Sequence, residues 1–165
     1  MSNGKVVWIT GASSGIGKEM AKEWARLGYT VVLSARREEL LNQIAQEIHV
    51  TGGKAFVVLC EVMNEESIPQ ATELIIKHCG RLDIANAGFG VYGKIEELSA
   101  AEWNRQLQGN VVGLALTAKY AIPHLKKTQG RLGLVGSVAA YFDFPNNCIY
   151  IKPNSLYKDT YVDHN

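Results

Sequence analysis

The chain has 165 residues, of which 47% are hydrophobic and 20% are charged, and its formal net charge at pH 7 is +1. This is the composition of a soluble globular protein of about one domain, with enough apolar residues to bury a substantial core. The small net charge excludes electrostatic capture of nucleic acid, and no apolar run reaches the roughly 20 residues that span a bilayer, so we expect neither a nucleic-acid nor a membrane partner.

The cysteines and the amino-terminal residues indicate in which cellular compartment the protein lies. Residues 1–5 lack the long apolar segment of a signal peptide. The three cysteines, Cys60, Cys79 and Cys148, form no Cys-x-x-Cys pair, and their odd number argues against a disulfide framework. We therefore expect a cytoplasmic protein with free thiols and without a metal site.

A glycine-rich turn spans residues 10–17, between the apolar run of residues 6–9 and a stretch whose apolar residues recur at helical spacing. A strand, a glycine turn and a helix form the first unit of a dinucleotide-binding sheet, because a pyrophosphate binds backbone N–H groups at a helix N-terminus. Glycine removes side chains that would block this approach. The alternative is a turn that binds no ligand. The residues expected to contact the cofactor are Gly11, Ser13, Ser14, Gly15, Ile16 and Gly17.

The second expected strand, residues 29–34, is followed by Arg36 and Arg37. In dinucleotide folds an acidic residue near this strand end binds the ribose 2′-hydroxyl of NAD, whereas an arginine accommodates the 2′-phosphate of NADP. No acid precedes Arg36, and two glutamates come only after both arginines, so the sequence favours NADP over NAD. The alternative is that both arginines belong to a solvated charge cluster at the start of the next helix.

The remaining elements continue the alternation of strands and helices. Amphipathic helices are expected over residues 38–51 and 67–79, and strands over residues 54–60, within 80–88 and over 132–135. A long helix runs from Ser99 towards Pro123, with Ser99 and Glu102 as a capping box. This pattern predicts an α/β fold: a Rossmann-like, doubly wound parallel sheet of five strands in the order 3-2-1-4-5, with helices on both faces.

Asn110 lies midway along this long helix, among apolar residues. A buried asparagine in such a place needs a hydrogen-bonding reason. The alternative is an asparagine on the surface of the helix.

Three motifs together point to a known family. Thr10 precedes a Gly-x-x-x-Gly-x-Gly turn, Asn86-Ala87-Gly88 follows the fourth strand, and Ser137 and Tyr150 lie thirteen residues apart. Over residues 5 to 150 the chain resembles the short-chain dehydrogenase/reductase family in all three motifs.

The resemblance implies hydride transfer between a nicotinamide and the carbonyl or alcohol carbon of a small-molecule substrate. By the same resemblance, Tyr150 is the general acid/base, Ser137 hydrogen-bonds the substrate oxygen, and Asn110 orders the proton relay. The further cofactor contacts that it implies are Glu61 and Val62 near the adenine ring, and Asn86, Ala87 and Gly88 along the cofactor.

The chain departs from the family pattern at four places. Glu61 stands where the family usually has aspartate, and Ala85 replaces the first asparagine of the family's Asn-Asn-Ala-Gly motif. The fourth strand is about two residues short, so we expect it either to be truncated or to take residues from the preceding loop. Asn154 stands where the family has a lysine, four residues after the tyrosine. Lys152 cannot replace that lysine, because two residues along a helix correspond to a rotation of about 200°. The catalytic set is therefore incomplete.

Residues 1–150 are expected to form one NAD(P)-binding Rossmann domain and residues 151–165 an atypical tail, so that the sheet is truncated after about the fifth strand. A one-base frameshift just after Tyr150 and a divergent C-terminus both account for this tail. The predicted function is an NADP-preferring oxidoreductase, impaired in this chain. The alternative is a non-catalytic dinucleotide-binding protein or an inactive remnant of such an enzyme. Neither the substrate nor the oligomeric state can be read from the sequence.

Overall fold

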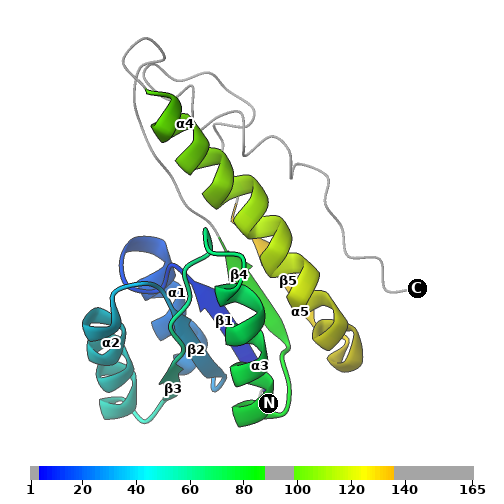
Figure 1. Cartoon of the computed structure of the whole chain (residues 1–165). Coiled ribbons are helices and arrows are strands. Elements are labelled where there is room, and N and C mark those ends of the chain that lie inside the picture. The colour runs from blue at the N-terminus through cyan, green and yellow to red at the C-terminus, as the bar shows by residue number, and fades with distance from the viewer. Residues whose placement is uncertain (1–3, 88–98, 136–165) are drawn as a thin grey trace.

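A five-stranded parallel sheet forms the centre of the computed structural model, which describes residues 4–87 and 99–135 (Figure 1). The strands are β1 (Val6–Thr10), β2 (Thr30–Ser34), β3 (Lys54–Val57), β4 (Ile84–Ala87) and β5 (Arg131–Leu134). The helices are α1 (Gly15–Arg26), α2 (Glu38–Val50), α3 (Ser67–Cys79), α4 (Ala100–Leu107) and α5 (Leu114–Thr128), and the π-helix η1 (Gln108–Gly113) joins α4 to α5. The strand order is β3-β2-β1-β4-β5, which confirms the predicted Rossmann-like topology.

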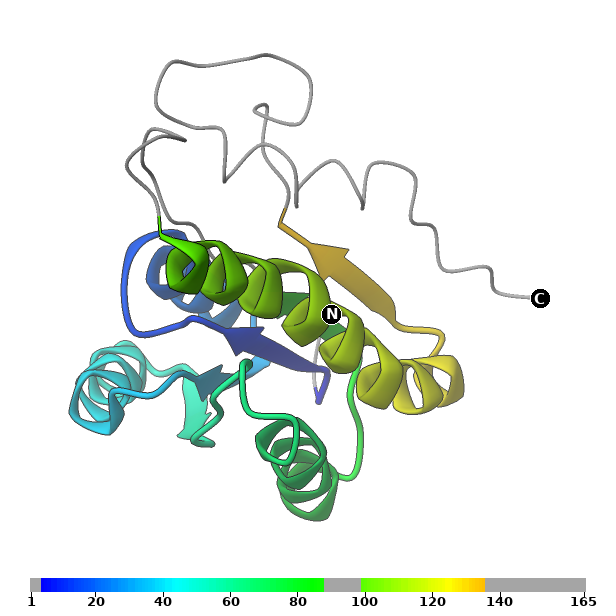
Figure 2. The ribbon, with the colours of Figure 1, turned by 45° about the horizontal axis from the view of Figure 1, so that its top comes forward.

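The central strands β1 and β2 are buried on both faces, as is usual in a parallel sheet. Helices α1 and α2 pack with Ile9 and Leu33 on one face, and α3 and α5 pack with Trp8 and Val32 on the other. Because neighbouring residues of a strand point to opposite faces, the apolar run of β1 supplies both cores, and all five of its residues are buried. Figure 2 shows α4, η1 and α5 as one long helix, whose α5 part packs on β4 and β5.

The long helix begins where the sequence predicts it. The Ser99 N–H donates to Glu102 Oε2 at 2.8 Å and the Glu102 N–H donates to Ser99 Oγ at 3.3 Å, so the predicted capping box is confirmed. The helix does not stop near Pro123, however, and continues to Thr128. Burial of Leu125 against the sheet outweighs the backbone hydrogen bond that a proline inside a helix removes.

The third strand is shorter than expected, and the fourth is short, as predicted. Strand β3 ends at Val57 instead of Cys60, although the N–H of Val58 still donates to the Leu33 carbonyl at 3.1 Å. Strand β4 has four residues, which confirms a truncated strand. It keeps its place because Asp83, just before it, donates its N–H to the Val6 carbonyl at 2.9 Å and accepts from the Arg131 N–H at 2.7 Å.

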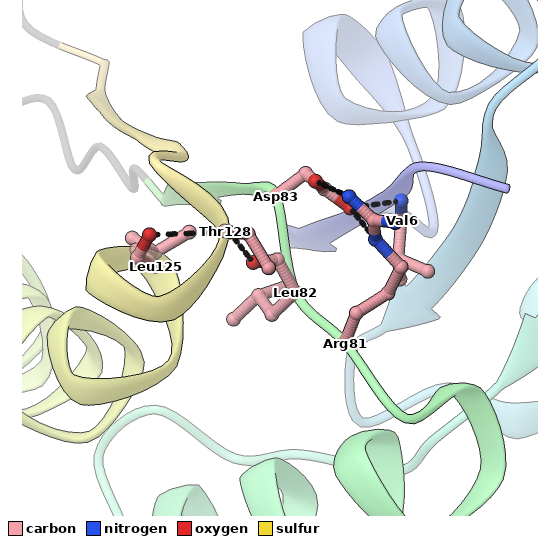
Figure 3. A network of polar contacts seen from close by, with 6 residues as sticks. All are labelled: Val6, Arg81, Leu82, Asp83, Leu125 and Thr128. Atoms are coloured by element: carbon pink, nitrogen blue, oxygen red, sulfur yellow. Dashed lines mark hydrogen bonds and ion pairs between the residues drawn. The ribbon is translucent and has the colours of Figure 1, made fainter.

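A polar network fixes the amino end of the sheet at the same point (Figure 3). The buried carboxylate of Asp83 accepts from the Val6 N–H at 2.8 Å and from two guanidinium nitrogens of Arg81 at 2.8 and 2.6 Å. The Thr128 hydroxyl donates to the Leu82 carbonyl at 2.7 Å. The segment before β4 is therefore bonded to β1 and to the end of α5.

In the described ranges, no helix is both long and apolar enough to cross a membrane.

Candidate cofactor site

A cavity of about 290 Å³ opens at the carboxyl ends of the central strands. Its walls come from the turns after β1, β2 and β3 and from one side of the long helix. The lining residues are Thr10, Gly11, Ser13, Ser14, Ala35, Arg36, Arg37, Cys60, Glu61, Val62, Met63, Gly109, Gly113 and Leu114. The chain runs outward from β1 to β2 and β3 and then crosses back to β4 on the other side of β1, and an open α/β sheet binds its ligands at this switch point.

The predicted glycine turn forms one wall of the cavity. Gly11 and Gly15 have φ angles of 69° and 55°, which favour glycine over residues with a side chain. A Cβ on Gly17 would lie 2.5 Å from the Gly11 carbonyl oxygen, so a side chain there would push α1 away from the turn. Ser14 precedes α1 without a side-chain cap hydrogen bond. This turn and helix N-terminus fit a phosphate group, which binds at N–H groups of this kind.

The two arginines after β2 have different partners. Arg37 Nη2 donates to the hydroxyl oxygens of Ser13 and Ser14, at 2.9 Å each, and so joins the turn after β2 to the glycine turn. Arg36 instead forms an ion pair with Glu61, with 3.7 Å between Nε and Oε1. Of the two arginines predicted to bind the cofactor, Arg37 is the one in contact with the glycine turn. Both arginines are exposed, as members of a solvated charge cluster also are, and each contacts cavity-lining residues.

Glu61 and Val62 follow β3 and form another wall of the cavity. The Glu61 N–H donates to Ser67 Oγ at 2.9 Å, which fixes the loop at the start of α3. The loop also lies against the long helix, because a Cβ on Gly113 would be only 2.6 Å from the Val62 carbonyl oxygen. Burial raises the pKa of the Cys60 thiol in the same wall, so this thiol stays protonated to higher pH than an exposed one.

Asn86 and Ala87 lie in β4. The Asn86 carbonyl accepts from Thr10 Oγ1 at 3.2 Å, which ties β4 to the end of β1. The buried Asn86 also borders a second cavity, of about 530 Å³, together with Trp24 and Tyr29 on the α1 side of the sheet. Gly88, the third residue of this motif, lies outside the described residues.

Asn110 is buried, with 1% of its surface exposed, so the alternative of a surface asparagine is wrong. It lies in η1, a six-residue π-helix inside an otherwise α-helical stretch. Such π-helical turns are rare and often mark functional sites. The sequence prediction missed this turn and the cavity-lining Gly109 and Gly113. Their four-residue spacing was the available signal, because it places two residues without side chains on one side of the helix.

Ser137 and Tyr150 lie outside the described residues, so their catalytic roles stay predictions. The described ranges also contain no group of three or more His, Cys, Asp or Glu residues arranged to hold a metal ion.

A family model described as short chain dehydrogenase matches residues 5–151. The chain belongs to the short-chain dehydrogenase family. An 11-beta-hydroxysteroid dehydrogenase A of Arachis hypogaea is 36% identical to it over 151 residues, which are 89% of this chain and 43% of that relative. The family prediction from the sequence is therefore confirmed.

Solved structures of short-chain dehydrogenase relatives have the same fold. The alcohol dehydrogenase of the archaeon Thermococcus sibiricus, complexed with 5-hydroxy-NADP, has a TM-score of 0.86 and 32% identity, covering 92% of this chain and 66% of that one. A 7 alpha-hydroxysteroid dehydrogenase, complexed with NADH and 7-oxo glycochenodeoxycholic acid, has a TM-score of 0.86 and 29% identity, covering 93% and 61%. The chain thus spans 43% to 66% of the length of these three proteins.

Proposed function

We propose that this chain is the nucleotide-binding part of an NADP-preferring oxidoreductase, which acts on a carbonyl or alcohol group of a small molecule. The observation that carries the proposal is the contact of Arg37 with the hydroxyls of Ser13 and Ser14 beside the cavity. A bound nicotinamide dinucleotide supplies the hydride donor or acceptor. The glycine turn binds its phosphates, and the walls formed by Glu61 and Val62 enclose its adenine end.

The preference for NADP follows from the partners of Arg37. Both hydroxyl groups are neutral, so the guanidinium keeps its full positive charge for an anion. A guanidinium has five N–H donors and can bind a 2′-phosphate while it keeps a serine contact. Arg36 adds a second positive charge, and its 3.7 Å pair with Glu61 is exposed and therefore weak. NAD lacks the 2′-phosphate and gains nothing from these charges.

The test is a fluorescence titration of the chain with NADPH and with NADH. A charge-assisted hydrogen bond to the 2′-phosphate is worth about 1.5–3 kcal/mol, so Arg37→Ala should weaken NADPH binding roughly 10- to 100-fold and leave NADH binding unchanged. Arg26→Ala is the matched control, because Arg26 pairs with Glu23 at the far end of α1. Equal affinities for the two nucleotides in the unaltered chain would overturn the preference.

The chemistry that we propose uses Tyr150 as the proton donor or acceptor, Ser137 as the partner of the substrate oxygen, and Asn110 in the proton relay. Asn154 stands where the family resemblance expects the lysine that lowers the pKa of the tyrosine. The chain as given should therefore consume NADPH slowly or not at all with aldehydes and ketones, since proton catalysis is worth ~10²–10⁴-fold. Asn154 at the position of the expected lysine also supports a second candidate function, a dinucleotide-binding protein without turnover.

The two candidate functions are separated by restoring the presumed reading frame after Tyr150. The frame-restored chain should reduce carbonyls if the oxidoreductase proposal holds, whereas Asn154→Lys alone should not restore turnover. Pro153 disfavours helical backbone angles in the residue before it, so the new lysine would be misplaced. Rapid NADPH consumption by the chain as given would contradict the proposed impairment.

A further inference from the structure

Strand β3 lies at one edge of the sheet, and no strand in the described ranges pairs with its outer side (Figure 1). Residues 55–60 have the sequence Ala-Phe-Val-Val-Leu-Cys, a run of six apolar residues without a charge or a proline. An open edge with such a run tends to pair with the same run of another molecule. Phe56 and Val57 are only half-buried and Leu59 is 48% exposed, so the run reaches the surface. Natural proteins protect edges of this kind with specific side chains.

The backbone groups of Ala55 and Val57 point away from the sheet. The N–H of Val58, just past the end of β3, donates to the Leu33 carbonyl of β2 at 3.1 Å. Because a strand is pleated, the backbone groups of successive residues point alternately to its two sides. The N–H and C=O groups of Ala55 and Val57 are therefore the ones that a further strand would bond.

His49, in the last turn of α2, covers these groups at Ala55. Its Nε2 atom lies 2.9 Å from the Ala55 carbonyl oxygen and 3.4 Å from the Ala55 nitrogen. An imidazole nitrogen donates in one tautomer and accepts in the other, so this atom can bond either group. In both tautomers the ring occupies the position at which the backbone of an added strand would meet Ala55.

The turn between α2 and β3 holds the imidazole in this place. The Gly52 N–H donates to the His49 carbonyl at 2.9 Å. The Gly53 N–H donates to the Ile48 carbonyl, also at 2.9 Å. Gly52 has a φ angle of 81°, and a Cβ on Gly53 would lie 2.7 Å from Ile48 Cγ2, so the turn packs tightly against the end of α2. The chain thus reverses within residues 50–53, which brings β3 back beside His49.

We propose that the outer edge of β3 is a surface through which two copies of this chain can pair, and that His49 keeps it closed. A second copy is the partner that fits, because the apolar run is flanked by Lys54 at one end and Glu61 at the other. When two such runs lie antiparallel, the Lys54 end of one copy meets the Glu61 end of the other, and these opposite charges attract. Such pairing lies outside the proposed function and needs no bound nucleotide.

Light scattering on the full chain at micromolar concentration tests this role of His49. His49→Ala frees both outward groups of Ala55, so the average mass should rise roughly twofold or more above that of the unaltered chain. His78→Ala is the matched control, because His78 also lies beside β3. Its ring lies against that of Phe56, with 5.8 Å between the centroids, and its Nδ1 bonds the Leu74 carbonyl of its own helix. An unchanged mass for His49→Ala, or an equal rise for His78→Ala, would overturn the proposal.

Two further variants show whether the backbone edge is the surface. His49→Gln should keep the mass of the unaltered chain, since a glutamine amide both donates and accepts and so can cover Ala55. Leu59→Lys, added to His49→Ala, places a charge at an exposed position within the apolar run and should reverse the association. Association that persists in either variant would mean that another surface is responsible, which also overturns the proposal.

Hydrogen exchange locates the contact in the associated His49→Ala chain. The amides of Ala55 and Val57 should exchange roughly fivefold or more slowly than in the same variant at high dilution, because each then donates to a second copy. The amide of Ile9 in β1 should stay protected, which shows that the associated chain is folded. Unchanged exchange at Ala55 and Val57, or loss of protection at Ile9, contradicts pairing through β3. None of these measurements uses nucleotide or turnover, so a failure of the proposed function in the NADPH titration remains a separate result.

Discussion

Two arginines at opposite ends of the same sheet show how their partners decide what an arginine can do. At the amino end, Arg81 donates twice to the carboxylate of Asp83, which also accepts from the Val6 N–H. At the carboxyl end, Arg37 donates to two hydroxyl groups at the rim of a cavity. The charge of Arg81 is neutralised within the fold, whereas that of Arg37 remains available to an anion. A charged side chain held by neutral groups is therefore the better indicator of a binding site.

The largest expected effect comes from breaking the amino-end network with Asp83→Ala. This change leaves the buried Val6 N–H without an acceptor and Arg81 without its counter-ion, so the free energy of unfolding should fall by about 2–4 kcal/mol. Urea unfolding measures it. The control is Glu23→Ala, which removes a similar two-nitrogen pair with Arg26 on the exposed surface of α1 and should lower the stability far less. Equal losses would show that burial of the pair is not what matters.

A smaller effect is expected at the carboxyl end from the titration of Cys60. Burial raises the pKa of this thiol above its ordinary value of 9.0, so the folded chain keeps a proton that the unfolded chain loses. Stability should therefore fall as the pH rises above this ordinary value, by at most about 1.4 kcal/mol per pH unit. Urea unfolding between about pH 8 and pH 10 should show a steeper fall for the unaltered chain than for Cys60→Ala. Parallel curves would mean that Cys60 is not the group responsible.

The smallest effect concerns the second arginine of the carboxyl end. Glu61→Gln removes the partly exposed partner of Arg36, and such pairs are worth about 0–1 kcal/mol. With Arg36 released, NADPH should bind roughly two- to threefold more tightly, and NADH should not. The measurement is the same pair of titrations, repeated at high salt, where the gain should shrink because the added ions screen the charges. A loss of NADPH affinity would instead assign Glu61 a direct contact with the nucleotide.

The sequence predicted those parts of the fold that depend on local pattern. Helix α3 was predicted with its observed bounds, and the Ser99 capping box was confirmed, because apolar periodicity and cap residues act within a few positions of the chain. The strand order followed from the alternation of strands and helices. The end of β3 was predicted three residues too late, because an apolar run continues past the point where the strand ends.

The parts of the site that the sequence did not predict depend on contacts between distant segments. Which of two adjacent arginines reaches Ser13 and Ser14 is decided by how β2 and α1 pack, and no local pattern encodes it. The π-helix around Asn110 likewise forms in a helix held by Gly113 against the loop after β3. The partner of a side chain in another element is a property of the folded molecule.

The hydrogen bonds around Asp83, just before β4, have a consequence for how the protein unfolds. The N–H groups of Val6 and Arg131 both donate to Asp83, and the Asp83 N–H donates to the Val6 carbonyl, although these residues are far apart in the sequence. None of the three can exchange with solvent deuterium while the other two bonds keep the strands together, so their exchange should be slow and similar in rate. Amides at the first turn of α1, beside the open cavity, should exchange much earlier. The amino end of the sheet would then be the last part of the described fold to open, and the nucleotide end the first.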